Sequence, residues 1–426
     1  MTSRQNADVD VVVVGAGLAG VRTALAAEAA GLSVRVLESS HRVGGRIVTD
    51  VVDGFRCDRG FQLLNPAYPA VKRFVDIEAL GLQTFGAGVL VRREDGLHRL
   101  GDPRRAPQYL LSTLRSGLIS PRELVGLARW VLPALARPQS VAHPDAGEDA
   151  GLYETWRRLG VTGPLRREVL EPFLGGTLST SQGDTSAAFV SLLLRSFVLG
   201  TPGVPEGGMQ AFPEQLAARL RTPVSLETPV ASLEHDDEGA TARTEGGETV
   251  RARAAVVAVG PERVGDLLPE HGGIPTNSLH TWWFEADALP DDSDLLAIDG
   301  RGVRPPGGPV QHAAVVSNAA PSYAPAGRHL VQATVLPDRV EGGGTESAVL
   351  RHLAGIYGVS TRRWELLVHH EVAPALPAQL PPLSVTDDQQ VGDRVWLTGD
   401  HTDTASIQGA LVAGERAGEA VVAALA

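Results

Sequence analysis

The chain has one cysteine, Cys57, and one lysine, Lys72, among its 426 residues. A single cysteine excludes an internal disulfide and a cysteine-based metal cage, and we predict no metal site. It also limits covalent attachment of a cofactor through sulfur to that one position. Because nearly all of the cations are arginines and the formal net charge is −12, the composition argues against a surface that binds nucleic acid.

Long hydrophobic runs are also lacking. Residues 1–8 are polar and contain no apolar core of a secretory signal, and the valine run at 11–14 is followed by glycines too early to span a membrane. We therefore expect a soluble, cytoplasmic protein. The composition, with 43% hydrophobic and 21% charged residues, is that of a globular chain, and its length accommodates two or three domains.

The valine run opens a motif that predicts nucleotide binding. Gly15, Gly17 and Gly20 follow it with the spacing G-x-G-x-x-G. Gly15 permits a tight turn, Gly17 lets the backbone approach a pyrophosphate, and Gly20 lets the next helix pack closely on the strand. That helix is predicted at 21–30, and its free N–H groups and dipole would bind the pyrophosphate.

A carboxylate completes this unit. Gly31 ends the predicted helix, residues 33–37 predict a second strand, and Glu38 stands at the end of that strand. A carboxylate at this position accepts hydrogen bonds from the hydroxyls of the adenosine ribose. Because strand, glycine turn, helix, strand and acid occur in this order, the pattern favours dinucleotide binding over a purely structural turn.

Three separated stretches of the chain are predicted to form one α/β domain. They are residues 1–64, 200–270 and 390–426, and each contributes a strand or helix of the nucleotide-binding type. The intervening residues 65–199, which are mostly helical in pattern, and 271–389, which alternate in short strands, would form a second domain. The predicted fold class is therefore α/β, with a Rossmann-like domain built from discontinuous segments and a second, α+β domain.

A second glycine motif follows Glu38. Gly44 and Gly45 let backbone N–H groups face an anion, and Arg46 can pair with a phosphate. Glu38 followed by Arg-Val-Gly-Gly-Arg at 42–46 resembles the flavin-containing amine oxidase superfamily, which includes monoamine oxidases, protoporphyrinogen oxidases and phytoene desaturases. The resemblance implies an amine oxidase-like fold and an FAD-dependent oxidoreductase.

The resemblance extends to other parts of the chain. Residues 395–400 and 406–414 are similar to the closing FAD motif of that superfamily, and 228–230 match a shorter central motif. Together the matches cover about a third of the chain. They imply FAD bound non-covalently and transfer of a hydride from a substrate C–H to flavin N5, and they do not identify the substrate.

The resemblance also implies roles for single positions. Glu38 would hold the adenosine ribose, and Arg46 would reach the phosphates or the flavin edge. Val230 would contact adenine through its backbone, and Asp400 would bind the ribityl–pyrophosphate region. The start of the last helix would stabilise negative charge on the flavin pyrimidine. The predicted cofactor-binding residues are Gly15, Gly17, Ala19, Gly20, Glu38, Ser39, Gly44, Gly45, Arg46, Gln62, Val230, Gly399, Asp400, Ile407, Gln408 and Ala410.

The chain departs from the superfamily at the substrate side. Ser406 stands where amine oxidases place a tyrosine of an aromatic cage, and residues 381–383, at the expected opposite wall, contain no aromatic. Many members carry a lysine near flavin N5 on the strand resembling 278–284, and this chain has none there. His280 on that strand is the candidate catalytic residue, as a pocket base or water anchor. The alternative is a strand histidine bonded to backbone.

Three functions remain open. The first is an oxidase or desaturase that acts on a mainly apolar small molecule. The second is an amine oxidase whose cage is rebuilt from Trp282, Trp283 or Trp364. The third is a non-enzymatic lipid or isoprenoid carrier of the same fold, against which Glu38 counts because a carrier needs no ribose ligand.

The expected partners follow from the same motifs. Because the chain has a single complete dinucleotide fingerprint, electrons are expected to leave to oxygen or a quinone. The apolar stripe at 122–135 resembles a membrane-surface helix, but core packing is favoured because an acidic chain would repel anionic lipid. The sequence does not predict the oligomeric state.

Overall fold

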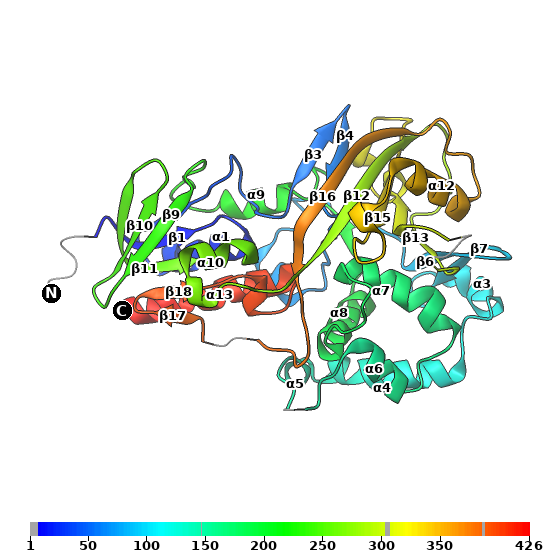
Figure 1. Cartoon of the computed structure of the whole chain (residues 1–426), viewed down its shortest axis with the longest axis horizontal. Helices are drawn as coiled ribbons and strands as arrows, with labels where there is room; N and C mark the ends of the chain where they lie inside the picture. The colour runs from blue at the N-terminus through cyan, green and yellow to red at the C-terminus, as the bar shows by residue number, and fades with distance from the viewer. Residues whose placement is uncertain (1–6, 146, 303–306, 386–387) are drawn as a thin grey trace.

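The computed structural model describes residues 7–145, 147–302, 307–385 and 388–426. Two seven-stranded sheets occupy the two ends of the molecule, and a group of helices lies beside the second sheet (Figure 1). Among the described residues, no helix has the length and apolar character needed to cross a membrane.

The first sheet has the strand order β17-β18-β11-β1-β2, with a hairpin of β9 and β10 joined to β11. Pairing is parallel from β18 through β11 and β1 to β2, so these four strands present their carboxyl ends at one edge. The strands are β1 (Val9–Val14), β2 (Val34–Leu37), β9 (Val230–His235), β10 (Ala240–Thr244), β11 (Thr249–Val257), β17 (Gln390–Gly392) and β18 (Val395–Leu397).

Both faces of this sheet are covered, which explains the uninterrupted valine run. Val11 and Val13 pack on one face against helices, whereas Val12 and Val14 pack on the other face against β9, β10 and a short helix. A parallel strand buried on both faces needs apolar side chains at every position. The helices around this sheet are α1 (Leu18–Ala29), α2 (Pro69–Phe74), α9 (Ala211–Ala217), α10 (Val264–Leu267) and α13 (Ile407–Leu425).

The two ends of the chain meet where α1 packs on α13. A Cβ on Gly414 would lie 2.3 Å from the Ala19 carbonyl oxygen, and a Cβ on Gly418 would lie 2.6 Å from the Ala26 Cβ. The Thr23 hydroxyl donates to the Gly414 carbonyl over 2.9 Å. Glycines in α13 therefore allow the two backbones to approach closely.

The second sheet has the order β16-β12-β15-β14-β13-β6-β7 and is antiparallel except between β13 and β6. Helix α12 covers one of its faces in a cluster that includes Trp282 and Trp364. Its elements are β6 (Gly88–Arg93), β7 (Gly96–Gly101), β12 (Thr276–Ala286), β13 (Leu296–Asp299), β14 (Val310–Val315), α11 (Val316–Ala319), β15 (His329–Val335), α12 (Glu346–Tyr357) and β16 (Glu365–Pro377).

The helical group packs around Trp130 and Trp156, whose rings meet edge to face at 5.8 Å. It comprises α3 (Leu110–Arg115), α4 (Pro121–Ala136), α5 (Pro138–Ala142), α6 (Leu152–Arg158), the π-helical turn Leu165–Leu170, α7 (Glu171–Leu178) and α8 (Ala187–Leu199). Two small sheets complete the fold, formed by β3 (Thr49–Val52) with β4 (Phe55–Asp58) and by β5 (Gln83–Thr84) with β8 (Gly203–Val204).

The structure confirms the predicted α/β class and differs in details. Because β6 and β7 belong to the second sheet, the stretch 65–199 is less helical than its pattern indicates. The helix predicted at 21–30 begins earlier, at Leu18, and the strand predicted at 33–37 is β2, which also makes one bridge between Leu37 and Ser225. The first sheet takes its strands from the three stretches assigned to the nucleotide domain, and the division at the stated boundaries stays a proposal.

Candidate functional site

A cavity of about 980 Å³ runs from the first sheet to the second. At one end it is lined by Val14, Leu37 and Ala258, which lie at the carboxyl ends of β1 and β2 and just after β11. At the other end it is lined by residues of α7, α8 and the second sheet. Ligands of open parallel sheets bind outside the carboxyl ends of the strands, so the first end is where a dinucleotide would lie.

The three motif glycines have the geometry that their predicted roles require. Gly15 has φ +106°, and a Cβ there would lie 2.6 Å from the Ala258 carbonyl oxygen. A Cβ on Gly17 would meet no atom within 4 Å, so its backbone faces open space in the cavity. A Cβ on Gly20 would lie 2.0 Å from the Gly15 carbonyl oxygen, so this glycine packs the helix and does not line the cavity.

Glu38 is held at the cavity wall by backbone donors. Its Oε2 accepts from the Ala16 N–H over 2.7 Å, and its Oε1 accepts from the Ser40 N–H over 2.9 Å. The residue is only 7% exposed. The Ser39 hydroxyl also donates to Oε1 over 3.4 Å, so it is Oε2 that keeps a free lone pair for a ribose hydroxyl.

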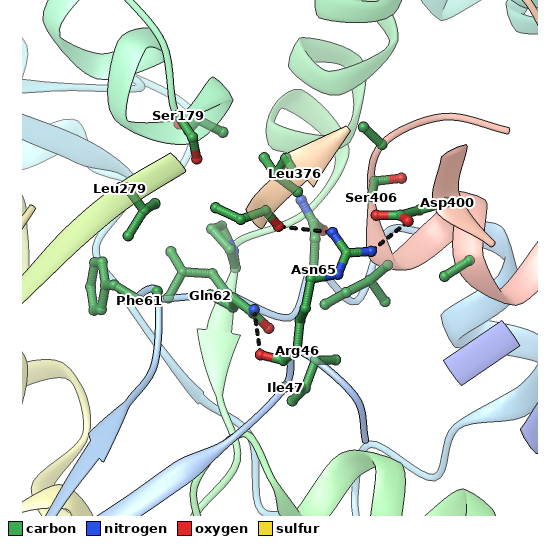
Figure 2. Close-up of a pocket in the computed structure, with 18 of the residues that line it drawn as sticks. Arg46, Ile47, Phe61, Gln62, Asn65, Ser179, Leu279, Leu376, Asp400 and Ser406 are labelled. Atoms are coloured by element: carbon green, nitrogen blue, oxygen red, sulfur yellow. Dashed lines mark hydrogen bonds and ion pairs between the residues drawn. The ribbon is translucent and has the colours of Figure 1, made fainter. Parts of the chain in front are cut away.

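Arg46 joins the two ends of the chain inside the cavity (Figure 2). Its Nη2 donates to Asp400 Oδ1 over 2.5 Å, and its Nη1 donates to the Ala375 carbonyl over 2.8 Å. Gln62 Nε2 in turn donates to the Arg46 carbonyl over 3.1 Å. Gly44 and Gly45 precede Arg46 with φ of +114° and +59°, which place this turn in the left-handed region.

The start of α13 also faces the cavity. Ser406 caps it, since the hydroxyl accepts from the Gly409 N–H over 3.0 Å. Ile407 and Ala410 line the cavity, but Gln408 points elsewhere, and its Oε1 accepts from the Ala70 N–H over 2.9 Å. The described cavity wall includes all of the predicted cofactor-binding residues except Gly20 and Gln408, namely Gly15, Gly17, Ala19, Glu38, Ser39, Gly44, Gly45, Arg46, Gln62, Val230, Gly399, Asp400, Ile407 and Ala410.

His280 lies outside the cavity, contrary to the expectation that it faces a substrate. Along β12 it is Leu279 that lines the cavity, and because side chains alternate on a strand, His280 points to the other face. There its Nδ1 lies 3.0 Å from Nε2 of His369 on β16. Burial lowers the pKa of His280. The described geometry therefore favours the alternative of a strand histidine over a pocket base, and the catalytic role of His280 stays a prediction.

The three tryptophans considered for a rebuilt cage also lie outside the cavity. Trp282 stacks on His369 at 3.8 Å between ring centroids, and Trp283 is fully buried in the core. Trp364 packs in the cluster below α12. The aromatic residues that do line the cavity, within the described ranges, are Phe61, Tyr68, Phe85, Phe173, Phe189 and Phe197.

The far end of the cavity is apolar. Among its lining residues are Phe85, Leu165, Val169, Phe173, Phe189, Leu193, Phe197 and Leu279. Asp102 also lines the cavity, but it is paired with Arg104 and Arg105 at 2.7 and 3.3 Å. The hydrogen bond from Arg104 lowers the pKa of Asp102 to about 2, so this carboxylate is charged and already paired. A second acidic residue on this side, Glu371, is exposed to solvent.

Sequence reasoning missed several lining residues. Arg42 begins the motif at 42–46 but has no predicted role, and Glu262 and Arg263 lie at the nucleotide end outside any motif. His312 lies at the apolar end, on β14, whose sequence reads only as a buried strand. Burial lowers the pKa of His312 to about 4, so its ring is neutral near pH 7.

Sulfur and amine groups are absent from the described cavity wall. Cys57 is fully buried on β4 in the core of the first sheet and does not line the cavity. Lys72 lies exposed on α2, also away from it. No cysteine of the described residues therefore lies in the cavity wall, where it could form a thioether link to a cofactor.

Comparison with known proteins places these features in context. Residues 18–422 match the family model described as flavin containing amine oxidoreductase. Putrescine oxidase of Kocuria rosea is 31% identical over 279 residues, which are 59% of this chain and 57% of that protein. Protoporphyrinogen oxidase 2 of Arabidopsis thaliana is 24% identical over 53% of this chain and 50% of its own length. The chain thus aligns with 50–57% of the length of these curated relatives.

The fold is also found in solved structures. A putrescine oxidase variant with redesigned cofactor binding has a TM-score of 0.74 at 19% identity, covering 97% of this chain and 99% of that one. A putative protoporphyrinogen oxidase from Exiguobacterium has a TM-score of 0.68 at 20% identity, covering 98% and 99%. At these identities the likeness concerns the fold alone.

Proposed function

The chain belongs to the flavin-containing amine oxidoreductase family, and from that premise we propose that it is an FAD-dependent oxidoreductase acting on a mainly apolar small molecule. The observation that carries the proposal is the composition of the single continuous cavity. Its nucleotide end has the glycine turns and the carboxylate of a dinucleotide site, and its far end is walled mainly by aliphatic and phenylalanine side chains.

The cavity fits FAD. Gly17 leaves open space for a pyrophosphate beside the start of α1, and Glu38 keeps a lone pair for a ribose. The capped start of α13 directs its partial positive charge to the place where a flavin pyrimidine would lie. Because Cys57 does not line the cavity, we propose that FAD is held non-covalently.

FAD supplies the two-electron chemistry when bound, and the chain supplies orientation and charge. Arg46 holds Asp400 and the Ala375 carbonyl in fixed positions beside the flavin end. The phenylalanines and leucines of the far end exclude water and hold an apolar substrate against the same region. Hydride transfer needs no charged base when the substrate C–H is already activated, and we assign no such base to this chain.

Oxidation of a simple amine is the alternative, favoured by the similarity to putrescine oxidase. Two features of the cavity speak against it. Ser406 occupies the place of one cage tyrosine, and none of Trp282, Trp283 and Trp364 lines the cavity. A diamine would also need carboxylates enclosed at the far end, where Asp102 is already bound by arginines and Glu371 is exposed to solvent. A carrier function is disfavoured because Glu38 and Arg46 line the cavity. A lipid carrier would need no side chains that bind a ribose or a phosphate.

Anaerobic reduction of the flavin tests this proposal directly. The purified holoenzyme is mixed with polyenes, porphyrinogens, benzylic and aliphatic amines and amino acids, and the loss of flavin absorbance is followed. We expect bleaching by an apolar compound and slow or no bleaching by simple primary amines. Rapid bleaching by such amines would reverse the order of the two functions, and a colourless protein that cannot take up FAD would exclude both. Reoxidation by oxygen or a quinone then tests the acceptor that we propose.

A further inference from the structure

Two consecutive helices of the helical group turn apolar side chains toward solvent. Figure 1 shows α3 and α4 in the half of the molecule away from the first sheet. Scattered single leucines on a surface need no explanation, but a cluster of them marks a contact surface. Twelve large hydrophobic residues are exposed in the described chain, and six of them lie on α3 and α4 and define what we call the α3–α4 surface: Leu110, Leu111, Leu114, Leu124, Val125 and Leu132.

Helix α3 buries a polar residue and exposes its leucines. Thr113 is the buried residue of this helix, and its hydroxyl donates to the Tyr109 carbonyl over 2.8 Å. Leu111 and Leu114 are 63% and 65% exposed. A surface helix of a globular protein turns its apolar residues to the core, so packing within the chain does not account for these leucines.

The apolar stripe at 122–135, on α4, is divided between the core and solvent. Trp130 is buried in the core, as the pattern predicts. Leu124, Val125 and Leu132 are exposed, contrary to the expectation that this stripe packs in the core. Val125 and Leu132 are seven positions apart, about two helical turns, so they lie on one outward face of the helix.

The charge of this segment is opposite in sign to that of the whole chain. Residues 103–142 contain six arginines and one acidic residue, Glu123, which gives a formal charge of +5 against −12 for the whole chain. Two of the arginines pair with Asp102. The other four are exposed and have no carboxylate partner in the described part of the chain, namely Arg115, Arg122, Arg129 and Arg137. The net charge of the chain therefore does not describe this face.

Arg122 and Arg129 border a hollow of about 480 Å³ beside α4. They are seven positions apart, so they lie along one edge of the helix. Val125 and Arg158, the last residue of α6, line the same hollow. Guanidinium groups bind phosphate oxygens with paired N–H donors, so this edge suits the phosphate of a lipid head group next to an apolar face.

The large cavity extends to the inner side of α3. Thr113 lines the cavity, whereas Leu111 and Leu114 of the same helix face solvent. Ile119, in the link between α3 and α4, also lines the cavity. The thickness of one helix, about 10 Å, therefore separates the cavity from the α3–α4 surface.

We propose that the α3–α4 surface docks on an anionic lipid bilayer, with its leucines among the acyl chains and its arginines at the phosphates. Surfaces that lie in the membrane interface combine an apolar face with a basic one, and anionic lipids attract the basic side chains. A second copy of this chain is disfavoured as the occupant, because a twofold contact would bring two positively charged segments together. Docking goes beyond the proposed function, and only the entry of an apolar substrate from the lipid rests on it.

Sedimentation with lipid vesicles tests the docking. Holoenzyme is mixed at low ionic strength with vesicles of phosphatidylcholine, either alone or with an equal amount of phosphatidylglycerol. We expect binding to the mixed vesicles to be at least about tenfold tighter than to phosphatidylcholine. Raising the salt to about 0.5 M NaCl should weaken it, because salt screens the attraction between arginines and phosphates.

Paired variants locate the contact on the protein. Arg122→Gln with Arg129→Gln, and separately Leu111→Gln with Leu114→Gln, should each weaken binding to the mixed vesicles by about tenfold or more. The matched controls change the same residue types at exposed positions elsewhere and should bind as the wild type does: Arg362→Gln with Arg363→Gln, and Leu226→Gln with Leu289→Gln. Equal flavin content and thermal midpoints in all variants show that each one is folded.

The single cysteine permits a test of orientation. Cys57 is fully buried, so a cysteine introduced on the surface can be labelled alone with a polarity-sensitive nitrobenzoxadiazole dye. On the mixed vesicles, dye at Leu114→Cys and at Leu132→Cys should shift its emission to the blue and be quenched by brominated lipid. Dye at Leu289→Cys should do neither.

The other outcomes distinguish this inference from its alternatives. Absence of binding to the mixed vesicles at low salt, or binding that the arginine and leucine variants leave unchanged, would overturn the inference. A dimer in analytical ultracentrifugation that the leucine variant dissociates, without vesicle binding, would assign the surface to a second copy and also overturn it. If docking is found but no apolar compound bleaches the flavin, the proposed function fails while the docking surface stands.

Discussion

The Arg46 guanidinium donates to the Asp400 carboxylate over 2.5 Å, across 354 positions of sequence. Arg46 ends the second glycine motif and Asp400 belongs to the closing motif, so the contact unites two patterns that the sequence presents separately. Both side chains line the cavity, with 28% and 7% of their surfaces exposed. The pair therefore fixes the geometry of the flavin end before any ligand arrives.

The effects of substituting Arg46 and Asp400 on FAD affinity should be strongly coupled. Asp400→Asn and Arg46→Met should each weaken FAD retention by about tenfold or more, since a charge-assisted hydrogen bond contributes about 1.5–3 kcal/mol. The double variant should lose less than the product of the two effects, because each single change leaves the other charge unpaired. Dissociation constants from flavin fluorescence on reconstitution of the apoprotein measure this. Strictly multiplicative losses would show that the two residues act independently.

Glu38 should be needed for cofactor retention and not for folding. Glu38→Gln keeps one acceptor oxygen, so one of the two backbone N–H groups loses its partner, and the change also removes the charge that binds ribose hydroxyls; FAD affinity should therefore fall by one to two decades. Glu248→Gln is the control, because this exposed glutamate pairs with Arg35 far from the cavity wall. The flavin-to-protein ratio after gel filtration at micromolar protein reports the result. Equal ratios in both variants would contradict the assigned role.

His280 should affect stability more than turnover. Its side chain lies against His369 and outside the cavity, so His280→Ala should keep its yellow colour and an anaerobic bleaching rate within about twofold of the wild type. A general base is worth 10²–10⁴-fold in rate, so the two possibilities are easily distinguished. A hundredfold slower bleaching with unchanged flavin content would restore His280 as a catalytic candidate.

Buried His312 should make the protein less stable in mild acid. Burial lowers its pKa to about 4, whereas the unfolded chain protonates a histidine near pH 6.5. Below pH 6.5 the unfolded state therefore gains a proton that the native state refuses, and its contribution to stability falls by about 1.4 kcal/mol per pH unit until pH reaches about 4.

Denaturant unfolding at pH 7 and pH 5 tests this sign. Between these values the wild type should lose about 2 kcal/mol more than His312→Leu. His41→Leu, at an exposed position, should follow the wild type. A parallel fall in wild type and His312→Leu would show that the imidazole is protonated in the folded state.

The nucleotide end could be predicted from sequence because its determinants are local. Gly15, Gly17 and Gly20 are set by the turn and by contacts within one strand–helix unit, and Glu38 follows the next strand directly. Such patterns repeat wherever the same short unit binds the same ligand. The order of elements then indicates the first sheet, with errors in element ends such as the start of α1 at Leu18 instead of residue 21.

The substrate end depends on contacts that no local pattern encodes. Whether Leu279 or His280 faces the cavity is a one-residue question of strand register, and the position of His312 depends on a bulge and on Gly176 in a distant helix. Helix α4 shows the same limit. Its buried positions include Glu123, whose carboxylate accepts from the Gly163 N–H over 2.7 Å, whereas Leu124 is 45% exposed.

The pairing of β1 with β11 and of α1 with α13 has a consequence for the order in which the protein matures. During synthesis the first strand emerges with β2 as its neighbour, but its other partner begins at Thr249 and the helix that covers it begins at Ile407. Contacts of such long sequence separation form slowly, since closing the intervening loop costs entropy first. The nascent chain therefore exposes an apolar strand edge throughout most of translation, and it cannot retain the nucleotide until its final helix has left the ribosome.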